Sequence, residues 1–259
     1  MEVCQQVNRP ARDGGPRTVS RKPSERSERP ATEGRRILLI FAALLLSACA
    51  DEPPEDSILV KQFERIAFSS EIGNQGRTGR LVKWVSPVRV WVPKSDQGYF
   101  TGEVNQRLKW LRGITGHDIA LAPPTQGSGN LHIRFVSREQ VRRESGQDAP
   151  CFTQVITKGG IIHWATISIA PESDALTAHC LTEELTQAMG LLDDSPLIED
   201  SLFNDASTRP DIPIGDAVLL FTLYDPHLLP GMRKEQAMPI AKAIIENKSG
   251  QFRSGFLPF

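Results

Sequence analysis

The sequence is poor in histidine, with five residues scattered over 259 positions. Four of them fall on predicted strands or turns and do not cluster along the chain: His117, His132, His163 and His227. A catalytic zinc ion usually takes three protein ligands, most often histidines, together with a water molecule. This scarcity argues against a histidine-rich zinc centre.

The sequence also lacks an apolar run long enough to cross a bilayer, which needs about 20 residues. Residues 37–46 form a shorter run that follows Arg35-Arg36 and ends at Leu46-Ser47-Ala48-Cys49. A positive flank, a short apolar core and small residues are typical of a signal peptide. The last four residues resemble a bacterial lipobox, which implies acylation of Cys49, and several acyl chains anchor a protein stably. A plain secretory peptide cleaved nearby is the alternative.

We therefore expect the protein to reside in the bacterial cell envelope, attached to the membrane through acylated Cys49. Ala50, rather than aspartate, follows this cysteine. In a Gram-negative host this resembles lipoproteins sorted to the outer membrane, on its periplasmic face.

Excess positive charge is missing from the part of the chain after the signal segment. Residues 1–36 hold nine Lys/Arg and five Asp/Glu, residues 37–49 hold no charge, and the whole chain carries −1, so residues 50–259 carry −5. This acidic balance argues against a nucleic-acid partner.

The domain organisation follows from composition. Residues 1–36 lack apolar periodicity and are predicted to be a disordered leader, or to precede the true start. Residues 37–49 are the signal core and lipobox, and residues 50–80 a linker with an apolar stretch near residues 58–68 that could be helical. Residues 81–248 are predicted to form one domain, and residues 249–259 a tail.

Cysteine is scarce as well. Cys4 lies in the leader and Cys49 in the lipobox, which leaves Cys151 and Cys180. An even pair in an oxidising compartment predicts a disulfide, with two buried free thiols as the alternative.

The apolar periodicity predicts an α+β domain. The predicted strands are residues 87–92, 119–122, 131–136 and 161–169. Helices are predicted at residues 99–111 and at about residues 174–190, the latter (the motif helix) capped by Ser173 or Asp174. Residues 137–150 are predicted to be a polar loop, and two apolar helices are expected after the motif helix.

The motif helix has the spacing of a zinc-peptidase helix, H-E-x-x-H-x-x-G-x-x-H/D, without its histidines. Glu183 and Gln187 stand in place of the first two histidines, Glu184 in place of the catalytic glutamate, and Asp193 in place of the third ligand. The order of strands and helices resembles the catalytic domain of metzincin-type zincins. That resemblance implies a zincin-like fold in which a twisted sheet backs this helix and its edge strand borders a substrate cleft.

A second resemblance rests on Cys-x-x-Glu-Glu-x-x-Gln-x-x-Gly-Leu at residues 180–191, with Leu223-Tyr-Asp-Pro226 and Leu229-Pro-Gly-Met232. These motifs are similar to those of a bacterial domain-of-unknown-function family, the one numbered twenty-nine twenty-seven, found in secreted proteins and lipoproteins. The resemblance covers about residues 82–245 and implies no activity.

The ligand set decides between catalysis and binding. Glu183 and Gln187 share a helix face, and Asp193 could join them, but an oxygen-only set suits calcium, magnesium or manganese better than zinc. We therefore expect no cofactor, with a divalent metal ion as the alternative. His179 and Glu183 have the same spacing, but that register puts Cys180 in place of the base. Glu183 and Glu184 lie about 100° apart around the helix and are not predicted to face each other.

We expect Glu183, Glu184, Gln187 and Asp193 to line a cleft edged by residues 161–169 that binds a peptide or protein without catalysis. If the protein is instead a metal-dependent peptidase or hydrolase, Glu184 would be its general base. A purely structural envelope module is the third option, in which the two glutamates are only a solvated helix face and Gln187 ties the helix to the edge strand.

Overall fold

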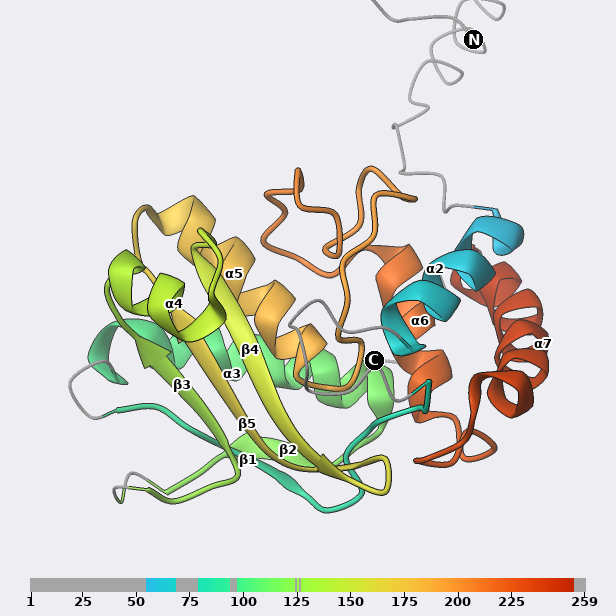
Figure 1. Cartoon of the computed structure of the whole chain (residues 1–259), viewed down its shortest axis with the longest axis horizontal. Helices are drawn as coiled ribbons and strands as arrows, with labels where there is room; N and C mark the ends of the chain where they lie inside the picture. Colours follow the sequence, from blue (N-terminus) through green and yellow to red (C-terminus); the bar gives the residue numbers. More distant parts are fainter. Residues whose placement is uncertain (1–54, 69–78, 94–96, 124, 126, 254–259) are drawn as a thin grey trace, which may run out of the picture. The chain divides into compact units, whose positions relative to one another are not determined.

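A computed structural model describes residues 55–68, 79–93, 97–123, 125 and 127–253 (Figure 1). Cys49, the signal segment, the leader and residues 254–259 of the tail lie outside this part. Among the described helices, none combines the length and the apolar character needed to span a membrane.

The described part has an α+β fold built on one five-stranded mixed sheet of order β2-β1-β3-β5-β4 (Figure 1). Its strands are β1 (Val88–Trp91), β2 (Ile119–Leu121), β3 (Leu131–Phe135), β4 (Cys151–Lys158) and β5 (Ile161–Ile169). β1 pairs in parallel with β2 and β3, and β3 in parallel with β5, whereas β4 is antiparallel to β5. β4 is therefore an edge strand with one neighbour in the sheet.

Six helices among the described residues pack on and beside this sheet. They are α2 (Asp56–Phe68), α3 (Gln97–Thr115), α4 (Arg138–Ser145), α5 (Asp174–Gln187), α6 (Ile214–Tyr224) and α7 (Lys234–Arg253). α3 and α5 lie on one face of the sheet, α4 lies over the other face near β4 and β5, and α2, α6 and α7 pack together at one side (Figure 1). The core lies between the sheet and α3, α5 and α6, and includes Val90, Ile133 and Ile167.

The motif helix is α5, and it begins as predicted, with the Ser173 hydroxyl accepting a hydrogen bond from the Leu176 N–H. Its apolar stripe is buried, with Leu181 and Leu185 at most 1% exposed. The helix ends at Gln187, before the predicted end at residue 190. Gly190 then turns the chain with a φ of 121°, where a Cβ atom would overlap the carbonyl oxygen of Val82. Glycine is the residue that this backbone conformation and close approach require.

The predicted disulfide is confirmed. Cys151 and Cys180 are bonded, with their Cα atoms 5.9 Å apart. The bond joins the first residue of β4 to α5 about one turn ahead of Glu183. It therefore fixes one end of the edge strand against the motif helix.

The packed region begins ahead of the predicted boundary at residue 81. Residues 56–68, within the predicted linker, form α2, and Leu59, Phe63 and Ile66 on its inner face are 0% exposed. Their spacing of four and three residues places them on one helix face. The apolar stretch near residues 58–68 is thus a core helix.

Two elements were missed in the sequence. The predicted polar loop at residues 137–150 contains α4, and residues 151–158 form β4. α4 has one buried apolar residue, Val141, which gives no helical periodicity. Its ends do carry a signal: the Ser137 side chain caps the backbone N–H of Gln140, and Gly146 closes the helix in the left-handed conformation.

Candidate functional site

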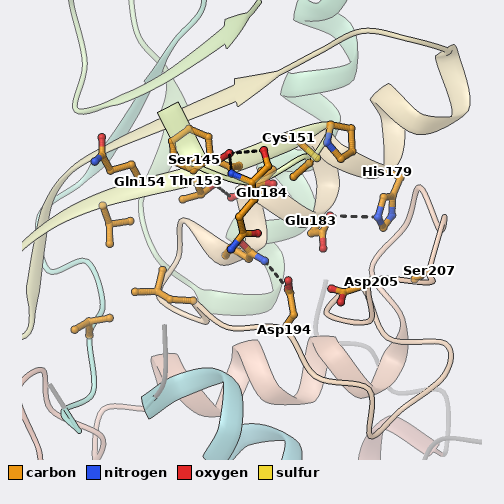
Figure 2. Close-up of a pocket in the computed structure, with 18 of the residues that line it drawn as sticks. Ser145, Cys151, Thr153, Gln154, His179, Glu183, Glu184, Asp194, Asp205 and Ser207 are labelled. Carbon is orange, nitrogen blue, oxygen red and sulfur yellow. Dashed lines mark hydrogen bonds and ion pairs between the residues drawn. The ribbon is translucent and has the colours of Figure 1, made fainter. Parts of the chain in front are cut away.

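A cleft of about 700 Å³ lies between the edge strand β4, the helix α5 and the chain that follows α5 (Figure 2). Glu183, Glu184 and Gln187 line it, as predicted from their spacing. The predicted edge at residues 161–169 is wrong, because that strand is β5, which lies one position inside the sheet. Residues 151–157 of β4 border the cleft instead.

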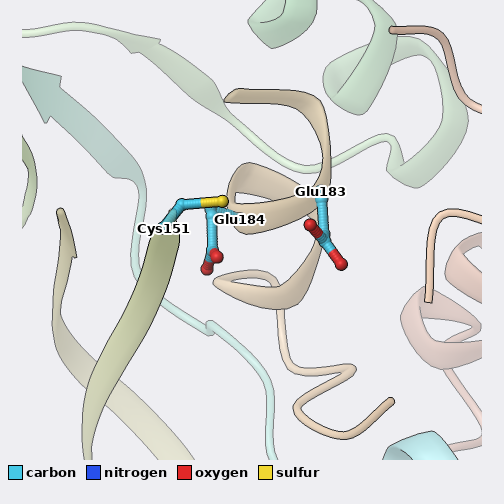
Figure 3. Close-up of side chains that lie close together, drawn as sticks. All are labelled: Cys151, Glu183 and Glu184. Carbon is cyan, nitrogen blue, oxygen red and sulfur yellow. The ribbon is translucent and has the colours of Figure 1, made fainter. Parts of the chain in front are cut away.

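Glu183 and Glu184 are both withdrawn from solvent. Glu184 is 3% exposed, and the side chain of Glu183 is 12% exposed, so the option of a solvated helix face does not hold. Carboxylate oxygens of the two residues lie within 4.8 Å of each other (Figure 3). This limit is longer than a hydrogen bond, so it does not contradict the prediction that the two residues, about 100° apart around the helix, form no facing pair.

His179 is the partner of Glu183 on the same helix face. Its Nε2 lies 3.2 Å from the Glu183 carboxylate (Figure 2), and its Nδ1 lies 2.9 Å from the carbonyl oxygen of Arg209. Burial works to lower the pKa of His179, but the hydrogen bond and negative charge of Glu183 outweigh it and raise that pKa above its ordinary value. The sequence shows that His179 and Glu183 are four residues apart on α5. In the structure, His179 holds the Glu183 carboxylate in place.

Gln187 donates from Nε2 to the Asp194 carboxylate at 3.0 Å, and Asp194 lines the cleft (Figure 2). The prediction named Asp193, which is not among the lining residues. Beyond the end of a helix, the position in space of a motif residue depends on the path of the turn that follows. Here the Leu192 N–H bonds the Ile66 carbonyl oxygen and sets that path, so the neighbouring aspartate reaches the cleft.

β4 is attached to α5 by a side chain. The Thr153 hydroxyl donates to the carbonyl oxygen of Glu184 at 3.0 Å. Thr153, not Gln187, ties the helix to the edge strand. Together with the Cys151–Cys180 bond, this contact fixes the position of β4 relative to the carboxylates of Glu183 and Glu184.

The opposite wall of the cleft comes from the irregular segment 193–213, which contributes Asp194, Asp205 and Ser207 to the lining. A buried carboxylate anchors this segment, as Asp216 accepts hydrogen bonds from the Ser201 hydroxyl at 2.8 Å and the Leu202 N–H at 2.6 Å. Complete burial raises the pKa of Asp216 to about 7, against the lowering effect of these two hydrogen bonds.

The metal-binding capacity of the cleft depends on the disulfide. Cys151, Glu183 and Glu184 place one ligand atom each within 4.8 Å of one another (Figure 3). The Cys151 sulfur is bonded to Cys180 and is not a thiolate, which is the form that binds metals. The remaining donors are carboxylate and amide oxygens, a set suited to calcium, magnesium or manganese.

Comparison with known proteins agrees with the motifs. The model of a family described as "Protein of unknown function (DUF2927)" matches residues 56–243, from the first residue of α2 into α7. No curated protein matches the chain.

Proposed function

The chain belongs to the DUF2927 family, whose description names no activity, and we propose its function from the site. We propose that it is a lipid-anchored protein of the cell envelope. It binds an extended peptide along β4, in a zincin-like cleft, without catalysing a reaction. The observation that carries the proposal is the free edge of β4 inside a cleft.

The pairing of β4 with β5 determines which main-chain groups of β4 remain free to pair with a peptide. The Pro150 carbonyl accepts from the Ala170 N–H, so residues 150, 152 and 154 direct their main-chain groups toward β5. In an antiparallel pair the intervening residues point the other way. The N–H and C=O groups of Thr153 and Val155 therefore face away from the sheet, and the described residues provide no backbone partner for them. Such an edge can accept a peptide by main-chain pairing.

The arrangement around this edge supports the zincin-like interpretation. The resemblance to metzincins implies a sheet behind the motif helix and an edge strand that borders the cleft. α5 packs against β4 and β5, and β4 borders the cleft above Glu183 and Glu184. The helix carries none of the histidines that zinc prefers at the matching positions, which favours binding over zinc catalysis.

The envelope location rests on the lipobox at Cys49 and is supported by the disulfide. Disulfides persist in oxidising compartments such as the bacterial periplasm and are rare in the cytosol. The Cys151–Cys180 bond is thus consistent with an exported protein.

A variant of β4 tests the peptide site. Val155→Pro removes an N–H that faces the cleft, and proline is tolerated on the outer side of an edge strand. We expect displayed random peptides that are selected on the wild-type protein to lose binding to Val155→Pro. They should keep binding to the control Val155→Ala, which loses the side-chain packing of valine but keeps the main-chain N–H. No enrichment of peptides on wild-type protein, or equal capture by the proline variant, would refute the proposal.

A hydrolase is the second candidate, and the closeness of the Glu183 and Glu184 carboxylates favours it. Two carboxyl groups at such a separation can act as general acid and base, with or without a divalent ion. A peptide-cleavage screen with added zinc, manganese or calcium separates the two candidates. Cleavage that Glu184→Gln lowers by about a hundredfold would establish the hydrolase, whereas peptide capture without cleavage supports the binding protein.

A further inference from the structure

The face of the sheet opposite α3 and α5 carries a row of large side chains. Trp91 on β1 and His132 on β3 are paired in register, with ring centroids 4.8 Å apart. Trp164 on β5 follows, with its ring 4.3 Å from that of His132, and Ile156 on β4 is paired with Trp164. Ile156 is 58% exposed, which is unusual for an isoleucine. The row crosses four of the five strands.

Beside this row is a cavity of about 430 Å³, and Phe152 and Gln154 line both this cavity and the cleft along the free edge of β4. Its lining is His132, Arg134, Glu144, Phe152, Gln154 and Thr166. His132 therefore belongs to both the cavity and the aromatic row. α4 supplies Glu144 and covers the far end of this face, where Val141, Phe152 and Ala170 pack together.

The cavity is polar but electrically balanced. The Arg134 guanidinium forms an ion pair of 2.6 Å with Glu144, and it also donates to the Ser168 hydroxyl at 2.7 Å. Burial lowers the pKa of His132, so its imidazole is neutral at neutral pH. A fixed cation next to a fixed anion favours neither an anionic nor a cationic ligand. The acidic balance of the chain argues against nucleic acid here as well.

Several nitrogen atoms at this place have no hydrogen-bond partner within the described residues. They are Nε2 of His132, Nε of Arg134 and Nε1 of Trp91, and all three are buried. Buried polar atoms are nearly always paired in native proteins, so each unpaired one calls for an explanation. Three of them around one aromatic row mark this face of the sheet as one where the described residues leave polar groups unsatisfied.

We propose that this cavity and the adjoining aromatic row bind a neutral saccharide. The C–H face of a sugar ring packs against aromatic rings such as those of Trp91 and Trp164. Its hydroxyl groups both donate and accept, which matches a lining that offers donors from Arg134 and Gln154 and acceptors from Glu144. Small-ligand sites commonly combine apolar walls with a few placed polar groups.

The test uses the full chain with defined probes: an oligomer of N-acetylglucosamine, a glucose oligomer and an acidic oligogalacturonate. Titration calorimetry and tryptophan fluorescence should show binding of at least one neutral oligomer and weaker or no binding of the acidic one. Trp164→Ala should weaken that binding about tenfold or more, by analogy with stacking on aromatic platforms. Trp110→Ala, the same change on α3, should leave it unaltered.

Thermal melts and a mass check of the Cys151–Cys180 bond verify that each variant is folded. Failure of both neutral oligomers to bind, tighter binding of the acidic probe, or unchanged affinity in folded Trp164→Ala would each overturn the inference. The result is independent of the peptide site, because Val155→Pro should leave saccharide binding unchanged: the Val155 side chain lies on the opposite face from Trp164 and Gln154.

Discussion

The buried carboxylate of Asp216 should make the stability of this protein strongly dependent on pH. Asp216 is 1% exposed in the first turn of α6, and it anchors segment 193–213 through Ser201 and Leu202. Desolvation raises its pKa from 3.8 to about 7, and the charge of Glu183 adds to this rise, while the two hydrogen bonds and Arg209 oppose it. The folded state therefore holds this proton more tightly than the unfolded chain does.

The sign and size follow from proton linkage. The stabilisation from the bound proton is fully present below the unfolded pKa of 3.8 and is lost as the pH rises through the folded pKa of about 7. Between pH 5 and pH 8 this single group should lower the free energy of unfolding by about 3 kcal/mol. That is a large share of the roughly 5–15 kcal/mol that stabilises a typical domain.

Asp216→Asn isolates the effect, since the amide keeps the shape and does not titrate. Urea unfolding followed by tryptophan fluorescence at several values between pH 5 and pH 8 gives the free energy for both proteins. The variant should be less stable at pH 5, because the amide cannot reproduce the donor and acceptor roles of the carboxyl group, and the gap should narrow toward pH 8. Other titrating groups, His179 among them, are common to both proteins and cancel. Parallel pH profiles would refute the reasoning.

Three further predictions concern the bridge, the histidine and the anchor. Replacing both cysteines of the disulfide, Cys151→Ser with Cys180→Ser, should lower the free energy of unfolding by about 3–4 kcal/mol for a closed loop of this length. Unfolding under non-reducing conditions measures this free energy. An unchanged value would contradict the loop-closure argument. Glu183→Gln should lower the pKa of His179, as followed by NMR of its ring protons, and no shift would exclude the ion pair. Cys49→Ser should move the protein from the membrane to the soluble fraction, and unaltered fractionation would reject lipid anchoring.

Much of the fold could be predicted from local patterns. α5 was predicted because its apolar residues recur at helical spacing after a serine cap, and the structure has both the stripe and the Ser173 cap. β3 and β5 were predicted from alternation, and Ile133 and Ile167 do face the core. The disulfide was predicted from the even number of cysteines that remain in a chain expected to be exported. In these cases the signal lies within a few residues or in composition, where sequence patterns are strongest.

The site itself was predicted less well, because it depends on tertiary structure. Alternation predicts residues 161–169 as the edge strand, but residues 151–158 form a hairpin with them and become the edge instead. Asp193 was chosen by motif spacing, but the turn at Gly190 presents Asp194. The distance between the Glu183 and Glu184 carboxylates could not be predicted, since it depends on side-chain torsions as well as on helix geometry.

The energetics of the cleft argue for a ligand over a purely structural role. Two glutamates with oxygens within 4.8 Å of each other, one of them 3% exposed, are costly to withdraw from water, and His179 offsets this cost for Glu183 alone. Apolar residues of similar volume in place of buried charged groups are often neutral or stabilising, so a domain that served only as a spacer has no physical reason to bury this pair. The disulfide, the Thr153 bond to Glu184 and the Asp216 anchor all act to hold the walls around these carboxylates. Groups that are unfavourable to bury and yet held in place are characteristic of functional sites. The extended peptide that we propose as the ligand would use both features, the carboxylates and the free edge of β4 beside them.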